Sequence, residues 1–363
     1  MHSTRVSRSH PGAMLRCMGS SVSEAQSPRF DVTTVQAALE VAVRAPSIHN
    51  TQPWRWRLDG DGLLLVADRE RQLSVADPDG HSLLVSCGAA LQLAELALRA
   101  AGWQFESSYL PDPADPDLLV RIRPVARGEA DDQLAAEVDS ARRRRCDRRP
   151  FAPGQIAAEV MEQLRIASDG ATTYVDFPDT PERHVELAVA LSWADRAERN
   201  DEAYLAEMSR WLRDPDVHTL VDGVPIDAIP HVPSGVRRHT DIPLRDFEVG
   251  VNGRQLIERD VDERPLIAVV FTEYGKPLDH LMAGMAMMRL MVQADLLGLS
   301  SCPLSQAVDF AAFRVRLKEQ MNWVGYPQMI VRFGRPMSPI TDLPLTPRRP
   351  VADVLDLATN PPG

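Results

Sequence analysis

The sequence predicts an α+β protein made of two similar halves in one chain. The first observation is a pair of apolar segments with helical periodicity, 86–102 and 283–298, each with two glycines about four helical turns apart. The second is that a predicted strand and then an arginine-bearing segment follow each helix in the same order. Duplication followed by divergence is the simplest explanation. Chance similarity between helices rich in alanine and leucine is the alternative.

The elements can be justified in chain order. An amphipathic helix stops at Pro46-Ser47, and residues 54–58 then alternate between apolar and polar as a half-buried strand does. Both long helices are apolar on nearly all sides, which predicts that they lie buried at the centre of the molecule. The strands that follow them are 118–123 and 329–334, and the basic segments are 142–149 and 348–349.

The domain boundaries follow from these elements. We place the first half at residues 29–140 and the second at 141–355. Residues 1–28 are rich in Ser, Arg and His and lack the apolar region of a secretory signal, so we expect a disordered extension. Residues 212–260 are dense in Pro, Asp, His and Arg without sustained periodicity. Such an insertion predicts a lid over a pocket, with an ordinary surface loop as the alternative.

Composition excludes several classes of function. The chain has 363 residues, 44% hydrophobic and 25% charged, which is typical of a soluble globular protein. The net charge of −11 disfavours binding to duplex nucleic acid or to an anionic membrane. The four cysteines lie far apart without a C-x-x-C pair, which argues against a disulfide framework or a zinc site and fits a cytoplasmic location.

The basic segment 142–149 is the strongest candidate for anion binding. Most of its residues are arginine, and Pro150 and Pro153 fix the backbone immediately afterwards. Forked guanidinium groups on a rigid backbone suit bidentate binding of phosphate. The alternative is a solvated surface run of charge.

The turn before the first strand is the second candidate. Ala45–Trp54 reads APSIHNTQPW, in which Asn50 and Gln52 present amide groups. Such amides can bind the hydroxyls and ring edge of a flavin. An ordinary turn next to a buried Trp is the alternative. His49 is the one histidine in this motif and therefore a candidate for the site. The alternative is a structural histidine with its hydrogen bonds satisfied inside the protein.

These motifs are similar to those of the FMN-dependent nitroreductase superfamily. APSIHNTQPW resembles its signature, and Arg144-x-Cys146-x-Arg148 resembles its phosphate-binding R-x-S-x-R/K segment. Residues 298–306 stand where the family has a loop that meets the flavin ring, and 346–350 resemble its C-terminal basic element. Cys146 departs from the family's hydroxyl and is a weaker donor. The resemblance implies that FMN is bound by Pro46, Ser47, Asn50, Gln52, Arg144, Cys146, Arg148, Pro303, Leu304, Ser305, Gln306, Arg348 and Arg349.

The order of the motifs resembles the fused, single-chain Acg-like branch of the family. The APSxxN motif occurs in the first half, whereas the corresponding positions 166–171 of the second half are a degenerate copy. One complete site can therefore be assembled from the two halves. The resemblance implies an α+β nitroreductase-like fold, a tandem pseudo-dimer in one chain with a lid insertion in the second half, holding one FMN. Further homodimerisation stays open.

The resemblance implies an oxidoreductase that takes electrons from NAD(P)H through flavin N5 and passes them to a small-molecule acceptor. Backbone donors of Ser305 and Gln306 would lie near the flavin ring, and we expect no catalytic side chain and no metal. A storage protein that sequesters FMN under the lid is the main alternative. A sensor that has lost the cofactor is a third. The segment 88–102 is not a G-x-G-x-x-G turn and no G-x-S-x-G is present, so neither a dinucleotide fold nor a serine hydrolase is supported.

Overall fold

The computed structural model describes residues 28–178, 180–214, 217, 220–231, 238–240, 242, 245, 254–255 and 261–357. Nearly all of the expected N-terminal extension, 1–28, therefore lies outside the described residues. So do residues 232–237 and most of 243–260, which belong to the predicted lid.

The first sheet has five strands in the order β15-β1-β2-β4-β3. Its members are β1 (Trp54–Asp59), β2 (Gly62–Ala67), β3 (Trp103–Tyr109), β4 (Leu118–Arg127) and β15 (Leu355–Leu357). Neighbouring strands are antiparallel except for β15, which pairs parallel with β1. The predicted strands at 54–58 and 118–123 are thus confirmed, with β4 extending further.

The second sheet repeats the strand order of the first. Its strands are β5 (Thr173–Asp176), β12 (Leu266–Thr272), β13 (Ser300–Leu304) and β14 (Tyr326–Gly334), in the order β13-β14-β12-β5. In each sheet the strand that follows the central helix is an edge strand, and the next strand along the chain pairs with it. The shared order confirms the predicted pair of similar α+β halves.

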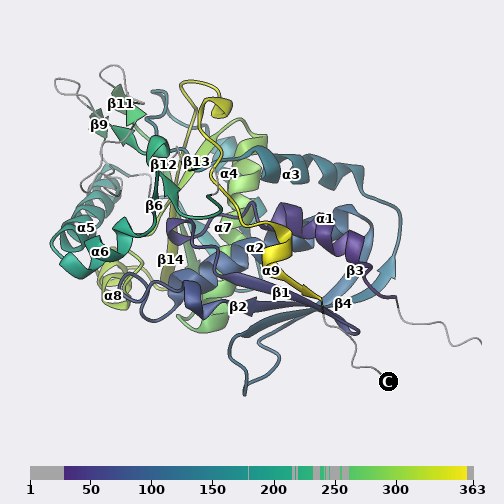
Figure 1. The fold of residues 1–363 in the computed structure, drawn as a ribbon. Coiled ribbons are helices and arrows are strands. Elements are labelled where there is room, and N and C mark those ends of the chain that lie inside the picture. Colours follow the sequence, from purple (N-terminus) through teal and green to yellow (C-terminus); the bar gives the residue numbers. More distant parts are fainter. Residues whose placement is uncertain are drawn as a thin grey trace, which may run out of the picture.

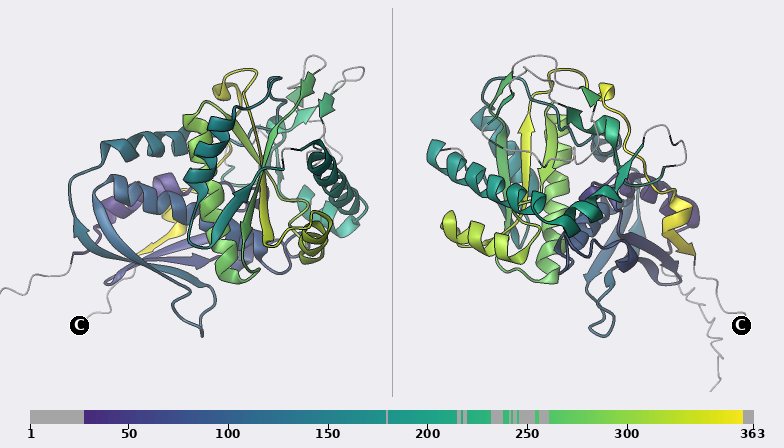
Figure 2. Two further views of the ribbon diagram at one scale, coloured as in Figure 1. Left: turned by 180° about the vertical axis from the view of Figure 1, so that it is seen from behind. Right: turned by 60° about the vertical axis from the view of Figure 1, so that its left-hand side comes forward.

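The two central helices, α2 (His81–Ala100) and α7 (Pro277–Leu296), cross each other between the sheets (Figures 1 and 2). A Cβ added at Gly88 would lie 2.0 Å from the carbonyl oxygen of Leu281, and one at Gly284 would lie 2.0 Å from that of Val85. The two contacts are equivalent under exchange of the halves, so matched glycines let the two helix backbones touch.

Both helices begin earlier than the apolar pattern alone predicts. The carboxylate of Asp77 accepts hydrogen bonds from the backbone N–H groups of Ser82 and Leu83, at 2.8 Å each, and so caps α2. Helix α7 starts at Pro277, where a missing N–H costs nothing. Helix α2 is long and apolar enough to cross a membrane by length and composition. However, 89% of its most apolar stretch of 18 residues is buried inside the protein, as in a core helix.

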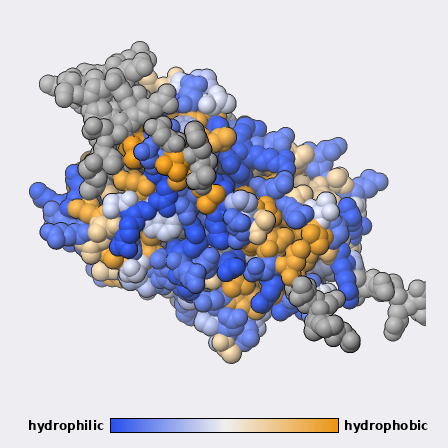
Figure 3. Space-filling model, viewed as in Figure 1, coloured by the Kyte–Doolittle hydropathy of each residue, from blue (hydrophilic) through white to orange (hydrophobic). Residues whose placement is uncertain are grey.

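Further helices cover the outer surfaces. These are α1 (Val32–Ala42), α3 (Asp132–Arg143), α4 (Ala158–Ser168), α5 (Pro181–Arg199), α6 (Glu202–Ser209), α8 (Ala311–Gln320) and α9 (Val351–Val354). One large core cluster contains side chains from α1, α2, α7 and both sheets, so the halves share a core. A second cluster lies between the second sheet and helices α5 and α8. The face in Figure 3 shows hydrophilic and hydrophobic residues interspersed.

The insertion in the second half is larger than predicted. Strands β1 and β2 are joined by a tight hairpin, whereas their counterparts β5 and β12 are separated by residues 177–265. This segment begins with α5 and α6, which have ordinary helical caps at Thr180 and Asp201 and gave no sign in the sequence of being inserted. In the topology the inserted chain therefore begins directly after β5, upstream of residues 212–260, whose bounds as a lid stay a prediction.

The C-terminal arm, residues 343–357, returns to the first half. It passes α9 and ends in β15, which extends the first sheet at β1 (Figure 1, yellow). The segment 141–355 therefore contains chain that packs on both sheets. The boundary between residues 140 and 141 stays a prediction, because part of the chain assigned to the second half packs on the first sheet.

Candidate functional site

The turn between α1 and β1 has an unusual backbone. His49, Asn50 and Gln52 adopt left-handed conformations with φ of 44°, 55° and 50°. Non-glycine residues in this region cost free energy and cluster at functional sites. The hydroxyl of Ser47 accepts a hydrogen bond from the backbone N–H of Gln52 at 2.9 Å, and that of Ser86 on α2 accepts one from Ile48 at 3.3 Å. The turn is thus fixed both to itself and to the central helix.

The Asn50 side chain joins three segments of the chain. Its Nδ2 donates to the carbonyl oxygens of Gly223 at 2.8 Å and Pro347 at 3.0 Å. Its Oδ1 accepts from the Arg348 guanidinium at 3.1 Å. Asn50 therefore attaches the insertion and the C-terminal arm to the turn, and it presents Arg348 to the interior.

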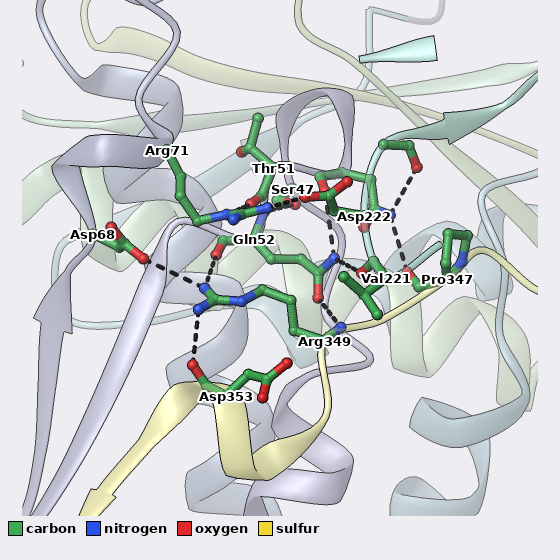
Figure 4. Close-up of polar contacts among 12 residues, drawn as sticks. Ser47, Thr51, Gln52, Asp68, Arg71, Val221, Asp222, Pro347, Arg349 and Asp353 are labelled. Atoms are coloured by element: carbon green, nitrogen blue, oxygen red, sulfur yellow. Dashed lines mark hydrogen bonds and ion pairs between the residues drawn. The ribbon is translucent and has the colours of Figure 1, made fainter. Parts of the chain in front are cut away.

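Gln52 and Arg349 also serve attachment, as Figure 4 shows. Gln52 donates to the carbonyl of Val221 at 2.8 Å and accepts from the backbone N–H of Arg349 at 2.9 Å. The Arg349 guanidinium turns away and contacts Asp68 at 3.4 Å and the carbonyl of Asp353 at 2.8 Å. Neither residue lines the cavities described below. We therefore do not keep these two residues in the candidate site, because their polar groups are used within the protein.

The basic segment lies beside the edge strand of the second sheet. Cys146 forms a parallel bridge with Ser301, and the backbone N–H of Asp147 donates to the Ser301 carbonyl at 2.9 Å. Arg149 is neutralised by a buried ion pair with Asp147 at 2.9 Å. The arginines of this run are thus not equivalent. Arg149 is structural, and Arg144 and Arg148 face the interior cavities.

The guanidinium groups of Arg44, Arg144 and Arg348 form a cluster next to the turn. Arg144 and Arg348 both donate to the carbonyl of Arg44, at 2.7 and 3.3 Å. Across the described residues, no carboxylate forms an ion pair with any of the three. Burial, together with Arg44 and Arg144, lowers the pKa of Arg348 to about 9. Within the structure's own contacts, Nε and one Nη of Arg144 and Nε of Arg348 are buried without a hydrogen-bond partner. Such a cluster is incomplete without an anion.

Two adjoining cavities meet at the turn. The larger spans about 740 Å³, including space open to solvent, and its lining includes the apolar side chains of Val85, Met287 and Met329. The smaller encloses about 500 Å³ and contains the three clustered arginines. Both cavities are lined by Pro46, Ser47, Cys146 and Arg148. The larger cavity, with its partly apolar lining, thus adjoins a smaller cationic one.

The predicted site residues divide between these cavities. Pro303 and Leu304, the last residues of β13, line the larger one together with Ser305 and Gln306, which directly follow the strand. Asn50, Arg144 and Arg348 line the smaller one. The structure thus brings together eleven of the thirteen predicted residues: Pro46, Ser47, Asn50, Arg144, Cys146, Arg148, Pro303, Leu304, Ser305, Gln306 and Arg348.

The sequence reasoning missed several residues of the site. Arg44 is the last charged residue of the first helical segment, and its position directly before APSIHN was the available signal. Arg245, from the insertion, lines the larger cavity, and its side chain is only 8% exposed. It donates to Glu198 at 3.0 Å and contacts Asp309 and His49. No local pattern marks Arg245, because its partners are distant in sequence.

His49 lies in this wall as a neutral residue. Its Nε2 lies 3.1 Å from an Nη of Arg245. Burial and the charges of Arg245 and Arg148 hold its pKa well below the ordinary value. A neutral Nε2 can accept a hydrogen bond from Arg245, so the ring supports the guanidinium that faces the cavity.

The corresponding region of the other half is occupied by protein. The Arg289 guanidinium on α7 donates to the carbonyls of Ala167 and Ser168, at 3.2 and 3.1 Å, and to Gln92 at 3.0 Å. These carbonyls belong to the segment 166–171 that resembles a degenerate turn motif. The carbonyl groups of this segment are therefore hydrogen-bonded within the protein.

Fold and site together define an α+β protein with two similar halves and two adjoining cavities at the turn before β1. No family model matches the chain. "Putative NAD(P)H nitroreductase Rv3131" of Mycobacterium tuberculosis (strain ATCC 25618 / H37Rv) is 34% identical over 336 residues, which cover 90% of this chain and 92% of that protein. "Putative NAD(P)H nitroreductase acg" of the same strain is 29% identical over 90% of this chain and 97% of its own.

The chain therefore belongs to the family of these NAD(P)H nitroreductase-like proteins, and the resemblance stated from the sequence motifs is confirmed. Among solved structures, the FMN and NADPH-dependent nitroreductase NfnB from sphigopyxis sp. strain HMH shares 15% identity over 61% of this chain and 99% of that one, with a TM-score of 0.38.

Proposed function

We propose that the protein binds one FMN across the two cavities and acts as an NAD(P)H-dependent oxidoreductase toward a small-molecule acceptor. The observation that carries the proposal is the cluster of Arg44, Arg144 and Arg348, at least partly buried, which lines the smaller cavity beside a larger one with a partly apolar lining. A phosphate would supply the charge that the cluster lacks, and bidentate contacts suit guanidinium groups. Relatives with nitroreductase names over 90% of the chain support the same assignment.

The residues present fit the proposed cofactor. The unpartnered guanidinium nitrogens of Arg144 and Arg348 could bind its phosphate. The apolar side chains of Val85, Met287 and Met329 could lie against its ring, with the polar groups of residues 303–306 at the edge. When bound, FMN accepts two electrons as hydride from a nicotinamide and passes them to a second substrate. The protein's part is to hold the cofactor, orient it and control access.

A second candidate is an FMN-storage protein without turnover. Arg245 favours it, since this residue of the insertion stands in the cavity wall and is held there by two buried carboxylates. A wall closed by the insertion would limit access of a nicotinamide. The two candidates differ in one measurable property, which is whether NAD(P)H reduces the bound flavin.

The experiment is a reduction assay on the protein as purified, preceded by a visible absorption spectrum. A flavin spectrum that NADH or NADPH bleaches supports the oxidoreductase. A flavin that dithionite reduces but neither nucleotide reduces supports storage, and colourless protein that does not take up FMN rejects both. Replacing Arg144 and Arg148 together with Ala should release FMN. Unchanged cofactor content in that variant would reject the assignment of the phosphate site.

A further inference from the structure

One cysteine stands where the two cavities meet. Cys146 lines both of them and is partly exposed, whereas Cys87 and Cys302 are buried. Burial raises the pKa of the Cys302 thiol to about 11, and it raises the pKa of Cys87 as well. Both buried thiols therefore stay protonated and unreactive near pH 7. Among the cysteines that the structure describes, Cys146 is the candidate for chemical modification.

The chain holds the Cys146 thiol next to the arginine cluster. After α3 the backbone is extended at Arg144, and Cys146 then pairs with Ser301 of β13. Arg144, Cys146 and Arg148 of this run all line the smaller cavity. The Cys146 thiol also contributes to the electrostatic field at the Arg348 guanidinium, which places these two groups close together.

The smaller cavity is strongly cationic. Five arginines contribute to its lining: Arg44, Arg144, Arg145, Arg148 and Arg348. No acidic residue lines it among the residues that the structure describes. Arg144 is only 4% exposed, and its Nε and one Nη have no hydrogen-bond partner within the described chain. Buried N–H groups of this kind call for an anion independently of the cysteine. A reagent with an anionic group is therefore drawn to the cluster, which brings its other atoms to the Cys146 thiol.

We propose that Cys146 is a site of S-thiolation by small acidic disulfides, and that this modification and bound FMN exclude each other. An acidic disulfide here is one that carries carboxylates near its S–S bond, as oxidised glutathione does. The inference rests on the proposed function, because the same arginines would hold the FMN phosphate. Loading of the cofactor then depends on the balance of thiols and disulfides around the protein.

The chemical step is a thiol–disulfide exchange. The S–H proton of Cys146 passes to solvent, and the sulfur attacks one sulfur of the disulfide. The S–S bond of the reagent breaks as the new S–S bond forms, and the other half leaves and takes up a proton. One disulfide is consumed and one is formed, so no further oxidant is needed. The half that stays on the protein places its carboxylates among the arginines and blocks the position of the phosphate.

The first test compares two alkylating reagents of similar size and different charge. FMN-free protein is treated with iodoacetate or iodoacetamide, and labelling of the Cys146 peptide is followed by mass spectrometry, with urea-unfolded protein as the reference. The ratio of the iodoacetate rate to the iodoacetamide rate should be about tenfold or more above the unfolded value, and it should fall as salt is added. FMN and inorganic phosphate should slow both reactions. A ratio equal to that of unfolded protein, or labelling that neither ligand slows, would overturn the proposal.

Two arginine variants decide whether the attraction is local. Arg348→Met should reduce the preference for iodoacetate several-fold, because it removes a charge beside the thiol. Arg55→Met is the matched control, since Arg55 is exposed on β1, pairs with Asp356 at 3.6 Å and lines neither cavity. Equal losses in the two variants would mean that only the net charge acts, which contradicts a cationic site around Cys146.

The second test follows cofactor uptake. Protein treated with oxidised glutathione should gain one glutathione at Cys146 and lose most of its FMN uptake, and dithiothreitol should restore the uptake. The FMN affinity of Cys146→Ser, whatever its value before treatment, should not change on treatment, because a hydroxyl does not exchange with a disulfide. Loss of affinity in the treated serine variant, or full uptake by wild-type protein modified at Cys146, would refute the mutual exclusion.

The outcomes separate this proposal from the proposed function. Protein that takes up no FMN even when its thiols are fully reduced contradicts the proposed function. The alkylation ratio and the protection by phosphate still test the cationic surroundings of Cys146 in that case. Protein that binds FMN and is reduced by NAD(P)H, but whose uptake is indifferent to modification at Cys146, contradicts the thiol proposal alone.

Discussion

Replacing Arg348 by Met should weaken FMN binding without weakening the fold. Arg348 contributes a guanidinium to a cluster that has no carboxylate partner within the described chain. Each charge-assisted hydrogen bond to a phosphate contributes about 1.5–3 kcal/mol, so losing one should lower affinity by about 10-fold to somewhat over 100-fold. Met keeps most of the buried aliphatic volume and removes the charge.

The stability of the FMN-free protein should not fall when Arg348 is replaced. Because the pKa of Arg348 is lowered to about 9, far below the ordinary value of an arginine, charging Arg348 costs a few kcal/mol in the folded state, since one unit is about 1.4 kcal/mol. Above pH 9 the unfolded chain binds more protons than the folded one, so this cost is complete below pH 9 and is relieved as pH rises above 9. Replacing Arg348 removes this free-energy cost at neutral pH.

Lost hydrogen bonds offset part of this gain. Arg348 donates to Asn50 at 3.1 Å and to the carbonyls of Pro347, Thr346 and Arg44 at 2.9, 3.3 and 3.3 Å, each contributing about 1 kcal/mol. We therefore expect Arg348→Met without FMN to be as stable as wild type or more stable, by about 0–2 kcal/mol.

The neighbouring residue gives the matched control. Arg349 pairs with the mostly buried Asp68 and bonds the Asp353 carbonyl, so Arg349→Met should lose on the order of 3 kcal/mol of stability. Flavin fluorescence titrations and urea unfolding, each with and without FMN, measure both quantities. If Arg348→Met destabilises the FMN-free protein as much as Arg349→Met does, the arginine cluster is a structural network and our reasoning on the anion site fails.

The remaining predictions concern the helix crossing and the pH dependence of stability. Gly88→Ala should lower the free energy of unfolding in urea by at least about 1–3 kcal/mol, because its Cβ would lie 2.0 Å from the Leu281 carbonyl oxygen. Gly60→Ala is the control and should be near neutral, because nothing lies within 4 Å of its Cβ. Equal effects of the two substitutions would contradict the close helix crossing. The folded-state pKa of Glu198 is raised from 4.5 to about 7, so its contribution to stability is present below pH 4.5 and is lost as pH rises through 7. Glu198→Gln should therefore flatten the fall in unfolding free energy over this range, and an unchanged pH profile would count against the raised pKa.

Local sequence determined much of the fold. Apolar periodicity predicted the two central helices, and alternation or short apolar runs predicted β1, β4 and β14. These features are readable because side-chain burial in a helix or strand repeats at a fixed interval. The two motif segments were also readable, since a turn and an arginine run are local properties; the left-handed backbone of the turn was seen only in the structure.

Only the tertiary structure decided which polar groups serve the site. Asn50 and Gln52 are both amides in one turn and both contact the C-terminal arm, yet Asn50 lines the smaller cavity and Gln52 does not. Arg348 and Arg349 are adjacent, yet one faces the cluster and the other faces Asp68. Arg245 meets Glu198 and Asp309 from three distant segments. Sequence sets the charge and hydrogen-bonding capacity of a side chain, but its partners depend on how distant segments pack, and those partners decide whether the group holds the fold or remains available to a ligand.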